Sequence, residues 1–137
     1  MRTALDSSVI FAIFKHERTA ARVFEIMARC AHDGDLVICE TTYAELAPAS
    51  DHIGVLNARL EELNLRLLPS TKETLFLAGR IFRAYRDAGG PRLQMMPDFM
   101  IAAHAQNQTA RIIANDRGYY RRYFPKLKVL SPTGADL

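Results

Sequence analysis

The chain has 137 residues, of which 49% are hydrophobic and 24% are charged. This size and balance are typical of a soluble globular protein, so we expect one domain over residues 1–137 and exclude a disordered chain. No apolar run has the length of a membrane span, and the first residues lack the pattern of a signal peptide. The net charge of only +3 is, by itself, weak support for a polyanionic partner.

The two cysteines, Cys30 and Cys39, lie in apolar segments and lack the CxxC or Cys/His spacing of a metal site. Buried free thiols are the simpler interpretation, and such thiols are typical of the reducing cytoplasm. We therefore expect a cytoplasmic protein without membrane contact.

Short apolar segments alternate with amphipathic segments from the N-terminus onward. The first half of the chain is expected to contain, in order, a strand over residues 2–5, a helix from about 9, a helix from about 19 to 34, a strand over 36–39, a helix over about 42–47 and a helix over 53–63. Ser7 or Ser8 can cap the first of these helices, and Thr41 or Thr42 the third.

The second half of the chain continues this alternation. We expect a strand over residues 66–68 and a helix over about 71–88 that buries Leu75, Ala78, Phe82 and Tyr85. An apolar helix over 99–105 that Pro97 and Asp98 open, and strands over 111–114 and 128–130, should follow. Short strands that are apolar on both faces and separated by helices predict an α/β fold with a mainly parallel sheet covered on both sides. Ligands of such sheets bind beyond the carboxyl ends of the strands.

Four acidic residues follow strands or begin helices at this edge of the predicted sheet: Asp6, Glu45, Asp98 and Asp116. Each has an ordinary structural explanation. Asp6 and Asp98 can be helix caps, Asp116 a turn residue, and Glu45 an exposed residue of a helix, with Glu40 as the functional acid in its place.

The four acids are harder to explain together, because carboxylates that meet at one edge repel one another. A divalent cation with a preference for oxygen ligands, Mg²⁺ or Mn²⁺, neutralises such a cluster. Such cations can activate a water molecule for attack on a phosphodiester. Zinc is disfavoured because no histidine has the spacing of a zinc ligand: His16, His32, His52 and His104.

The sequence resembles PIN domains of the kind found in VapC-type toxins of bacterial toxin–antitoxin pairs. The segments that carry the resemblance are residues 5–10 (LDSSVI), 43–46 (YAEL), 97–105 (PDFMIAAHA) and 112–120 (IIANDRGYY). The resemblance implies a three-layer α/β/α sandwich around a five-stranded sheet. It also implies a Mg²⁺- or Mn²⁺-dependent endoribonuclease that cuts a structured RNA, such as a tRNA or a loop of ribosomal RNA.

The same resemblance implies roles for the four acids. Asp6 and Asp98 hold the metal most directly, Glu45 completes the site, and Asp116 binds through water or holds a second ion. One departure from the family pattern is Ala114, where many relatives have Thr or Ser. The hydroxyl that is lost there would contact Asp6, the metal or a phosphate, and Ser7 or Ser8 can replace it.

Two basic segments are candidates for RNA binding. Arg80 and Arg83 recur with Arg86 along one helix, either as a contact for the RNA backbone or as a solvated face with an Arg83–Asp87 ion pair. Arg117 begins a second basic segment, in which tyrosines 119, 120 and 123 either stack on unpaired bases or pack the last helix onto the sheet.

The helix over residues 9–14 is apolar on every side, so part of it is expected to contact a partner. By the resemblance, this partner is an antitoxin segment laid across the first helices, and a second copy of the chain is a further partner.

Two alternative functions are compatible with the sequence. One is a non-catalytic RNA- or protein-binding module with a decayed site, which Ala114 makes conceivable and the presence of all four acids disfavours. The other is a phosphatase with Asp6 as nucleophile, which Ser8 disfavours because no acid follows Asp6 at that position.

Overall fold

In a computed structural model, residues 1–90, 96–115 and 118–133 of the chain are described. The strands are β1 (Thr3–Leu5), β2 (Leu36–Ile38), β3 (Leu65–Leu67), β4 (Arg111–Ile113) and β5 (Val129–Leu130). The helices in these residues are α1 (Ser7–Phe14), α2 (Ala20–Ala31), α3 (Glu40–Leu46), α4 (Ile53–Glu62), α5 (Lys72–Asp87), α6 (Met96–Gln108) and α7 (Tyr119–Tyr123), with a short 3₁₀ helix at Ala47–Ala49.

The strands form one parallel sheet in the order β3-β2-β1-β4-β5. β1 is central, since Thr3 is paired with Leu36 of β2 on one side and with Arg111 of β4 on the other. The predicted α/β fold with a five-stranded parallel sheet is therefore confirmed.

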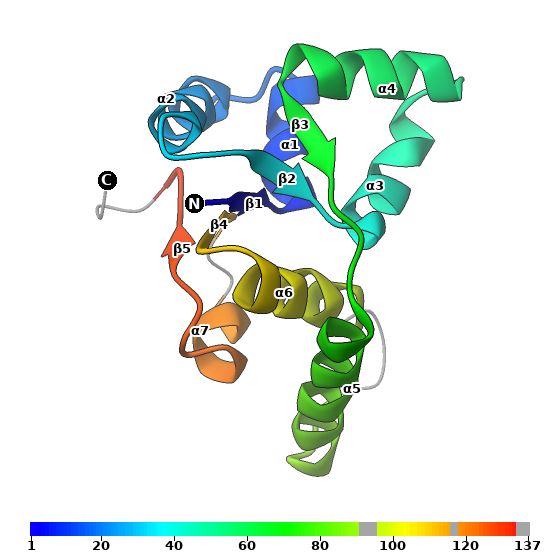
Figure 1. The fold of residues 1–137 in the computed structure, drawn as a ribbon, viewed down its shortest axis with the longest axis vertical. Coiled ribbons are helices and arrows are strands. Elements are labelled where there is room, and N and C mark those ends of the chain that lie inside the picture. Colours follow the sequence, from blue (N-terminus) through cyan, green and yellow to red (C-terminus); the bar gives the residue numbers. More distant parts are fainter. Residues whose placement is uncertain (91–95, 116–117, 134–137) are drawn as a thin grey trace.

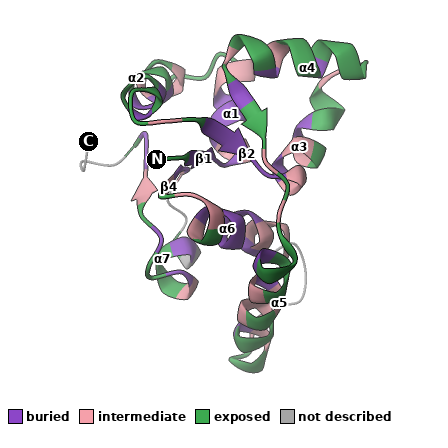
Figure 2. Ribbon diagram, in the orientation of Figure 1, coloured by how far each residue is buried: buried purple, intermediate pink, exposed green. Residues whose placement is uncertain are grey.

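Helices cover both faces of the sheet (Figure 1). Alternate residues of β1 enter different cores: Ala4 packs with α5, α6 and α7, whereas Leu5 packs with α1, α2 and α4. The same alternation places Ile112 and Ile113 of β4 in the two cores. Because successive side chains of a strand point to opposite faces, these two cores make three layers, as expected. Buried residues gather on β1, β2 and β4 and on α6 (Figure 2).

The structure identifies the N-cap residues of α1 and α3. Of the caps that the sequence offered for α1, Asp6 rather than Ser7 or Ser8 has this role, because its carboxylate accepts a hydrogen bond from the Ser8 backbone N–H at 3.3 Å. Cys39 occupies the N-cap position of α3 in place of Thr41 or Thr42. In both cases a single extended residue, Asp6 or Cys39, separates the strand from the helix. The strand–helix connections are therefore shorter than predicted.

α5 extends beyond the rest of the molecule (Figure 1). Ala78 and Tyr85 are buried on it as predicted, but Leu75 is 40% exposed and its neighbour Phe76 is 67% exposed. The expected burial of Leu75 is therefore wrong, because the first turns of α5 contact the core only through other side chains. None of the helices within the described residues combines the length and apolar character needed to cross a bilayer.

Candidate functional site

Asp6 lies where β1 ends, at the centre of the carboxyl edge of the sheet. Its backbone N–H donates to the carbonyl oxygen of Ile113, the last residue of β4, at 3.0 Å. This bond continues the pairing of β1 with β4 by one residue, so Asp6 lies next to the end of β4. The strand order runs outward in opposite directions from this point, towards β3 on one side and β5 on the other. Parallel α/β sheets bind ligands at such a reversal.

Both carboxylate oxygens of Asp6 accept hydrogen bonds from hydroxyl groups. The Ser8 hydroxyl donates to Oδ2 at 2.5 Å, and the Tyr120 hydroxyl donates to Oδ1 at 3.2 Å. The Asp6 side chain is only 4% exposed and forms no ion pair with any residue in the described part of the chain. Among those residues the carboxylate is therefore satisfied by hydrogen bonds alone, from the hydroxyl and backbone N–H of Ser8 and from the Tyr120 hydroxyl.

The sequence predicted either packing or base stacking for Tyr120, and the structure shows that it is buried. Its side chain is 1% exposed, so its ring offers no surface for a base. Its contact with Asp6 was not predicted, because the two residues are separated by 114 positions and no local pattern connects them.

Glu45 and Glu40, which the sequence left as alternatives, have different partners. The Ser7 hydroxyl donates to Glu45 Oε1 at 2.8 Å, which connects Glu45 to the residue that follows Asp6. Glu40 Oε1 instead accepts from the backbone N–H and the hydroxyl of Ser70, at 3.0 and 2.8 Å, and thereby holds the connection between β3 and α5. Glu45 is therefore the acid associated with Asp6, and Glu40 has a structural partner.

The same bonds perturb the pKa of Glu40. Burial acts to raise this pKa, but the hydrogen bonds from the Ser70 hydroxyl and from the backbone N–H groups of Glu40 and Ser70 outweigh burial, and the pKa is lowered. Glu40 is thus held in its charged form by the connection that it stabilises.

Asp98 is half-buried and lies in the first turn of α6, which begins at Met96, so the prediction that Asp98 caps this helix is wrong. α6 leads into the start of β4, so its first turn lies at the carboxyl edge of the sheet (Figure 1). The Thr41 hydroxyl, 3.9 Å from the Met100 sulfur, connects the N-terminal half of α6 to the start of α3. Asp6, Glu45 and Asp98 therefore share one edge of the molecule.

Asp116 and Arg117 lie outside the described residues. Within the described ranges, no three His, Cys, Asp or Glu side chains are arranged closely enough to hold a metal ion. The structure connects Asp6 and Glu45 through adjacent serines, and the complete four-acid cluster stays a prediction.

The donor set nevertheless fits a hard divalent cation better than zinc. Asp6 and Glu45 offer carboxylate oxygens, which Mg²⁺ and Mn²⁺ prefer.

His104 is buried in α6, where its Nε2 is 2.7 Å from the carbonyl oxygen of Leu68. Burial lowers the pKa of His104, against the opposing influence of this carbonyl and of Glu40. His104 therefore connects α6 to the end of β3.

The Ser8 hydroxyl lies beside the backbone that follows Ala114, the position where the sequence lacks the hydroxyl of many relatives. Ala114 is fully buried, and the Ser8 hydroxyl, besides donating to Asp6, lies 3.5 Å from the backbone nitrogen of Asn115. Of the two serines that the sequence offered as substitutes, Ser8 thus contacts Asp6, whereas Ser7 contacts Glu45. Contact of either serine with RNA stays a prediction.

Arg80 and Arg83 of α5 are exposed. Arg80 lies over the ring of Phe76, with 5.6 Å between its guanidinium carbon and the ring centroid. Arg83 is 3.7 Å from Asp87 in the predicted ion pair, and both side chains are largely exposed. A pair this exposed contributes little to stability, so Arg83 can exchange it for a phosphate.

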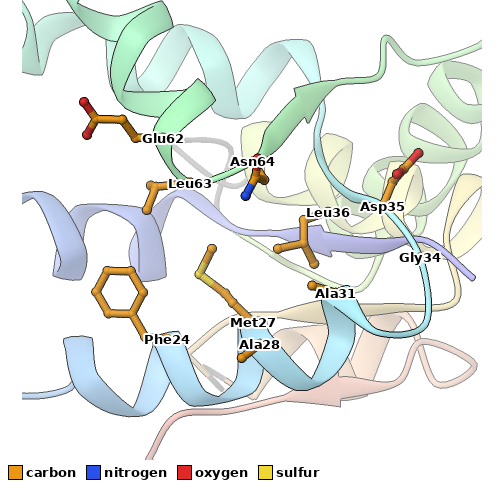
Figure 3. A pocket seen from close by; sticks show the side chains of 10 residues that line it. All are labelled: Phe24, Met27, Ala28, Ala31, Gly34, Asp35, Leu36, Glu62, Leu63 and Asn64. Atoms are coloured by element: carbon orange, nitrogen blue, oxygen red, sulfur yellow. The ribbon is translucent and has the colours of Figure 1, made fainter.

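A pocket of about 460 Å³ lies at the opposite edge of the sheet, where the strands begin. Phe24 and Met27 of α2 and Leu36 of β2 point into it (Figure 3). Asp35 and Glu62 add two carboxylates to its lining. The pocket therefore offers an apolar floor with acidic groups beside it.

Comparisons with known proteins agree on the fold. The family model for the PIN domain matches residues 3–125. One similar solved structure is VapBC-1 from nontypeable Haemophilus influenzae, with 22% identity, a TM-score of 0.76 and coverage of 98% of this chain and 100% of that chain. A second is VapBC2 from Rickettsia felis bound to a DNA fragment from their promoter, with 20% identity, a TM-score of 0.70 and coverage of 96% and 98%. A third is a toxin–antitoxin complex from Klebsiella pneumoniae, with 17% identity, a TM-score of 0.68 and coverage of 95% and 97%. No curated protein sequence matches the chain.

Proposed function

Since the chain belongs to the PIN-domain family, we propose that it is a VapC-type toxin, a divalent-metal-dependent endoribonuclease whose single nuclease domain comprises residues 1–137. The observation that carries this proposal is the Asp6 carboxylate, which is buried at the reversal point of the sheet and lacks an ion pair within the described residues. Such a group is suited to a cation.

In this proposal Asp6 and Asp98 are the principal ligands of Mg²⁺ or Mn²⁺, Glu45 completes the site, and Asp116 binds through water or holds a second ion. When bound, such a cation would supply a water molecule of lowered pKa for attack on the phosphodiester and would neutralise the charge of the phosphate. Ser8 and Tyr120 orient Asp6, and Ser7 orients Glu45.

The substrate in this proposal is a structured RNA, such as a tRNA or a loop of ribosomal RNA. The exposed Arg80 and Arg83 of α5 and Arg117 beyond β4 are its phosphate contacts, with Ser7 and Ser8 closest to the metal. The exposure of the Arg83–Asp87 pair supports this role, because its exchange for a phosphate costs little.

The partner in this proposal is an antitoxin segment that inserts apolar side chains into the pocket lined by Phe24 and Met27. The toxin–antitoxin complex from Klebsiella pneumoniae and the VapBC complexes, to which the fold is similar, support such a partner. A second copy of the chain is the other partner, and the exposed Leu75 and Phe76 on α5 are suited to that contact.

We place the protein in the cytoplasm, where its RNA substrate is found. Cys30 and Cys39 support this location because both are buried free thiols. Burial also raises the pKa of Cys39, which keeps the thiol protonated and unreactive.

The test of this function is cleavage of total cellular RNA by the purified chain, freed of bound partner, in Mn²⁺, Mg²⁺ or EDTA. Asp98→Asn is the inactive variant, and Glu40→Gln is the matched control, since Glu40 is an acid of the same edge that is bound to Ser70. We expect discrete fragments that require metal, disappear with Asp98→Asn and persist with Glu40→Gln.

Two outcomes would contradict the proposal. RNA binding without cleavage, unchanged by EDTA, would identify a non-catalytic module. Cleavage that survives Asp98→Asn would exclude this acid as a metal ligand or reveal a contaminating nuclease. Melting temperatures with and without Mn²⁺ separate loss of the metal site from loss of the fold, because bound metal stabilises only the native state.

A further inference from the structure

Tyr120 is placed between the hydrophobic core and the candidate metal site. It lies on α7, its side chain is 1% exposed, and it belongs to the core beneath α5 and α6 together with Phe99 and Phe124. Its hydroxyl emerges from that core at Asp6 Oδ1, 3.2 Å away. One end of the side chain therefore packs, and the other end contacts the acid that we propose as a metal ligand.

Packing alone does not require a tyrosine at this position. A phenylalanine ring fills the same volume, and a hydroxyl in an apolar core is costly unless it is hydrogen-bonded. Here the hydroxyl has a hydrogen-bond partner, since it donates to the Asp6 carboxylate at 3.2 Å.

Tyr120 and Ser8 together fix the orientation of the Asp6 carboxylate. Ser8 donates to Oδ2 from the start of α1, whereas Tyr120 donates to Oδ1 from α7. With one hydroxyl on each oxygen, rotation of the carboxylate breaks at least one bond. Oδ1, which accepts from Tyr120, keeps acceptor capacity for a cation, because a carboxylate oxygen has two lone pairs, whereas Oδ2 accepts from both the hydroxyl and the backbone N–H of Ser8.

We propose that Tyr120 is a positioning residue of the metal site, which it serves by holding Asp6 in the orientation that the cation requires. This inference rests on the proposed metal-dependent function. Groups that orient metal ligands in this way typically contribute about 10- to 100-fold to metal affinity. The core thus determines the geometry of the site through a single hydroxyl.

The test is Tyr120→Phe, which keeps the ring and removes the hydroxyl. The matched control is Tyr85→Phe, because Tyr85 is a buried tyrosine of the same core whose ring contacts Phe99. We expect the Kd for Mn²⁺, measured by calorimetry, to increase about 10-fold or more for Tyr120→Phe and to stay unchanged for Tyr85→Phe. Cleavage by Tyr120→Phe should require more Mn²⁺ and recover as the metal concentration rises.

A packing role would give a different result. Tyr120→Phe would then lower the melting temperature equally with and without Mn²⁺ and leave the Kd unchanged, and this outcome would overturn the inference. Mn²⁺ binding by the wild type together with an unchanged Kd for Tyr120→Phe leaves the proposed function intact. A wild type that binds no Mn²⁺ overturns both.

A second measurement applies if Tyr120→Phe does not fold. Mg²⁺ is then titrated into the wild type and Tyr85→Phe while tyrosine absorbance is recorded. A saturable absorbance change that is equal in the two proteins supports contact between a tyrosine hydroxyl and the metal site. The absence of any change, at Mg²⁺ concentrations that raise the melting temperature, would overturn the inference.

Discussion

At the scale of single residues, Asp6 combines two roles in one carboxylate. It caps α1 through the Ser8 backbone N–H, and the cap bond and the Ser8 hydroxyl use the same oxygen, Oδ2. The helix start therefore helps to orient the proposed metal ligand, because the cap and the ligand are one rigid group. A capping residue and a site residue are not alternatives at this position.

Glu45 and Glu40 allow a prediction from two acids on one short helix. Glu45→Gln should abolish metal-dependent cleavage with little change in stability. Glu40→Gln should leave cleavage intact but lower the free energy of unfolding by about 1.5 kcal/mol, because it weakens charged hydrogen bonds to Ser70. RNA cleavage and urea denaturation of both variants measure the two effects.

The same comparison has a pH dependence, because the pKa of Glu40 is lowered in the folded chain. The contribution of Glu40 to stability is present above its ordinary pKa of 4.5 and is lost as the pH falls through its folded value.

The cleavage assay decides between the two acids. Equal cleavage defects in Glu45→Gln and Glu40→Gln would contradict the assignment of Glu45 to the site.

At the scale of the elements, α6 is the central helix of one face. Its residues from Phe99 to Ala105 are largely buried, and His104 among them contacts the Leu68 carbonyl beyond β3. Burial favours the neutral form of the His104 imidazole. Protonation of this ring is therefore expected to weaken the packing of α6 at acidic pH.

The sign of this effect follows from the lowered pKa of His104. Unfolding exposes the ring, which then takes up a proton below its ordinary pKa of 6.5. The contribution of His104 is therefore fully present above that pH and falls as the pH decreases below it, by at most about 1.4 kcal/mol per pH unit for one proton. Denaturation between pH 7.5 and 5.5 in EDTA measures this slope, which His104→Gln should remove. An equal slope in the variant would assign it to other groups.

The elements were largely predictable because each has a local signal. Apolar residues 3–5 and 111–113 indicate strands without further context, and Pro97 with Asp98 marks the start of α6. Local signals do not predict the burial or the hydrogen-bond partner of a side chain when these depend on a residue far away in the sequence. The exposure of Leu75 depends on which turns of α5 meet the core, and the roles of Glu40 and Glu45 depend on Ser70 and Ser7. The contact between Tyr120 and Asp6 is of the same kind.

At the scale of the whole molecule, two exposed phenylalanines lie on different surfaces. Phe24, 46% exposed, lines the pocket between α2 and the end of α4, whereas Phe76, 67% exposed, lies on the projecting α5. Neither side chain belongs to the two cores, so substitutions there should leave the fold intact. This separation allows the two proposed partners to be tested independently.

Phe24→Ser should weaken binding of the antitoxin about tenfold or more and leave the oligomeric state unchanged, because it removes a ring from the pocket. Phe76→Ser should shift the chain from dimer to monomer and leave antitoxin binding unchanged. Titration calorimetry with the antitoxin and sedimentation of the free chain measure these effects. A dimer that persists in Phe76→Ser would place the contact between copies elsewhere.

The central position of β1 has a consequence for synthesis of the chain. β1 is made first, but one of its two neighbours is β4, and the hydroxyl that holds Asp6 Oδ1 is 114 residues further along. A chain still emerging from the ribosome therefore carries Asp6 without the strand and the tyrosine that complete its surroundings. For a nuclease proposed to cut the RNAs of translation, this order of assembly delays activity until β4 and α7 have been made.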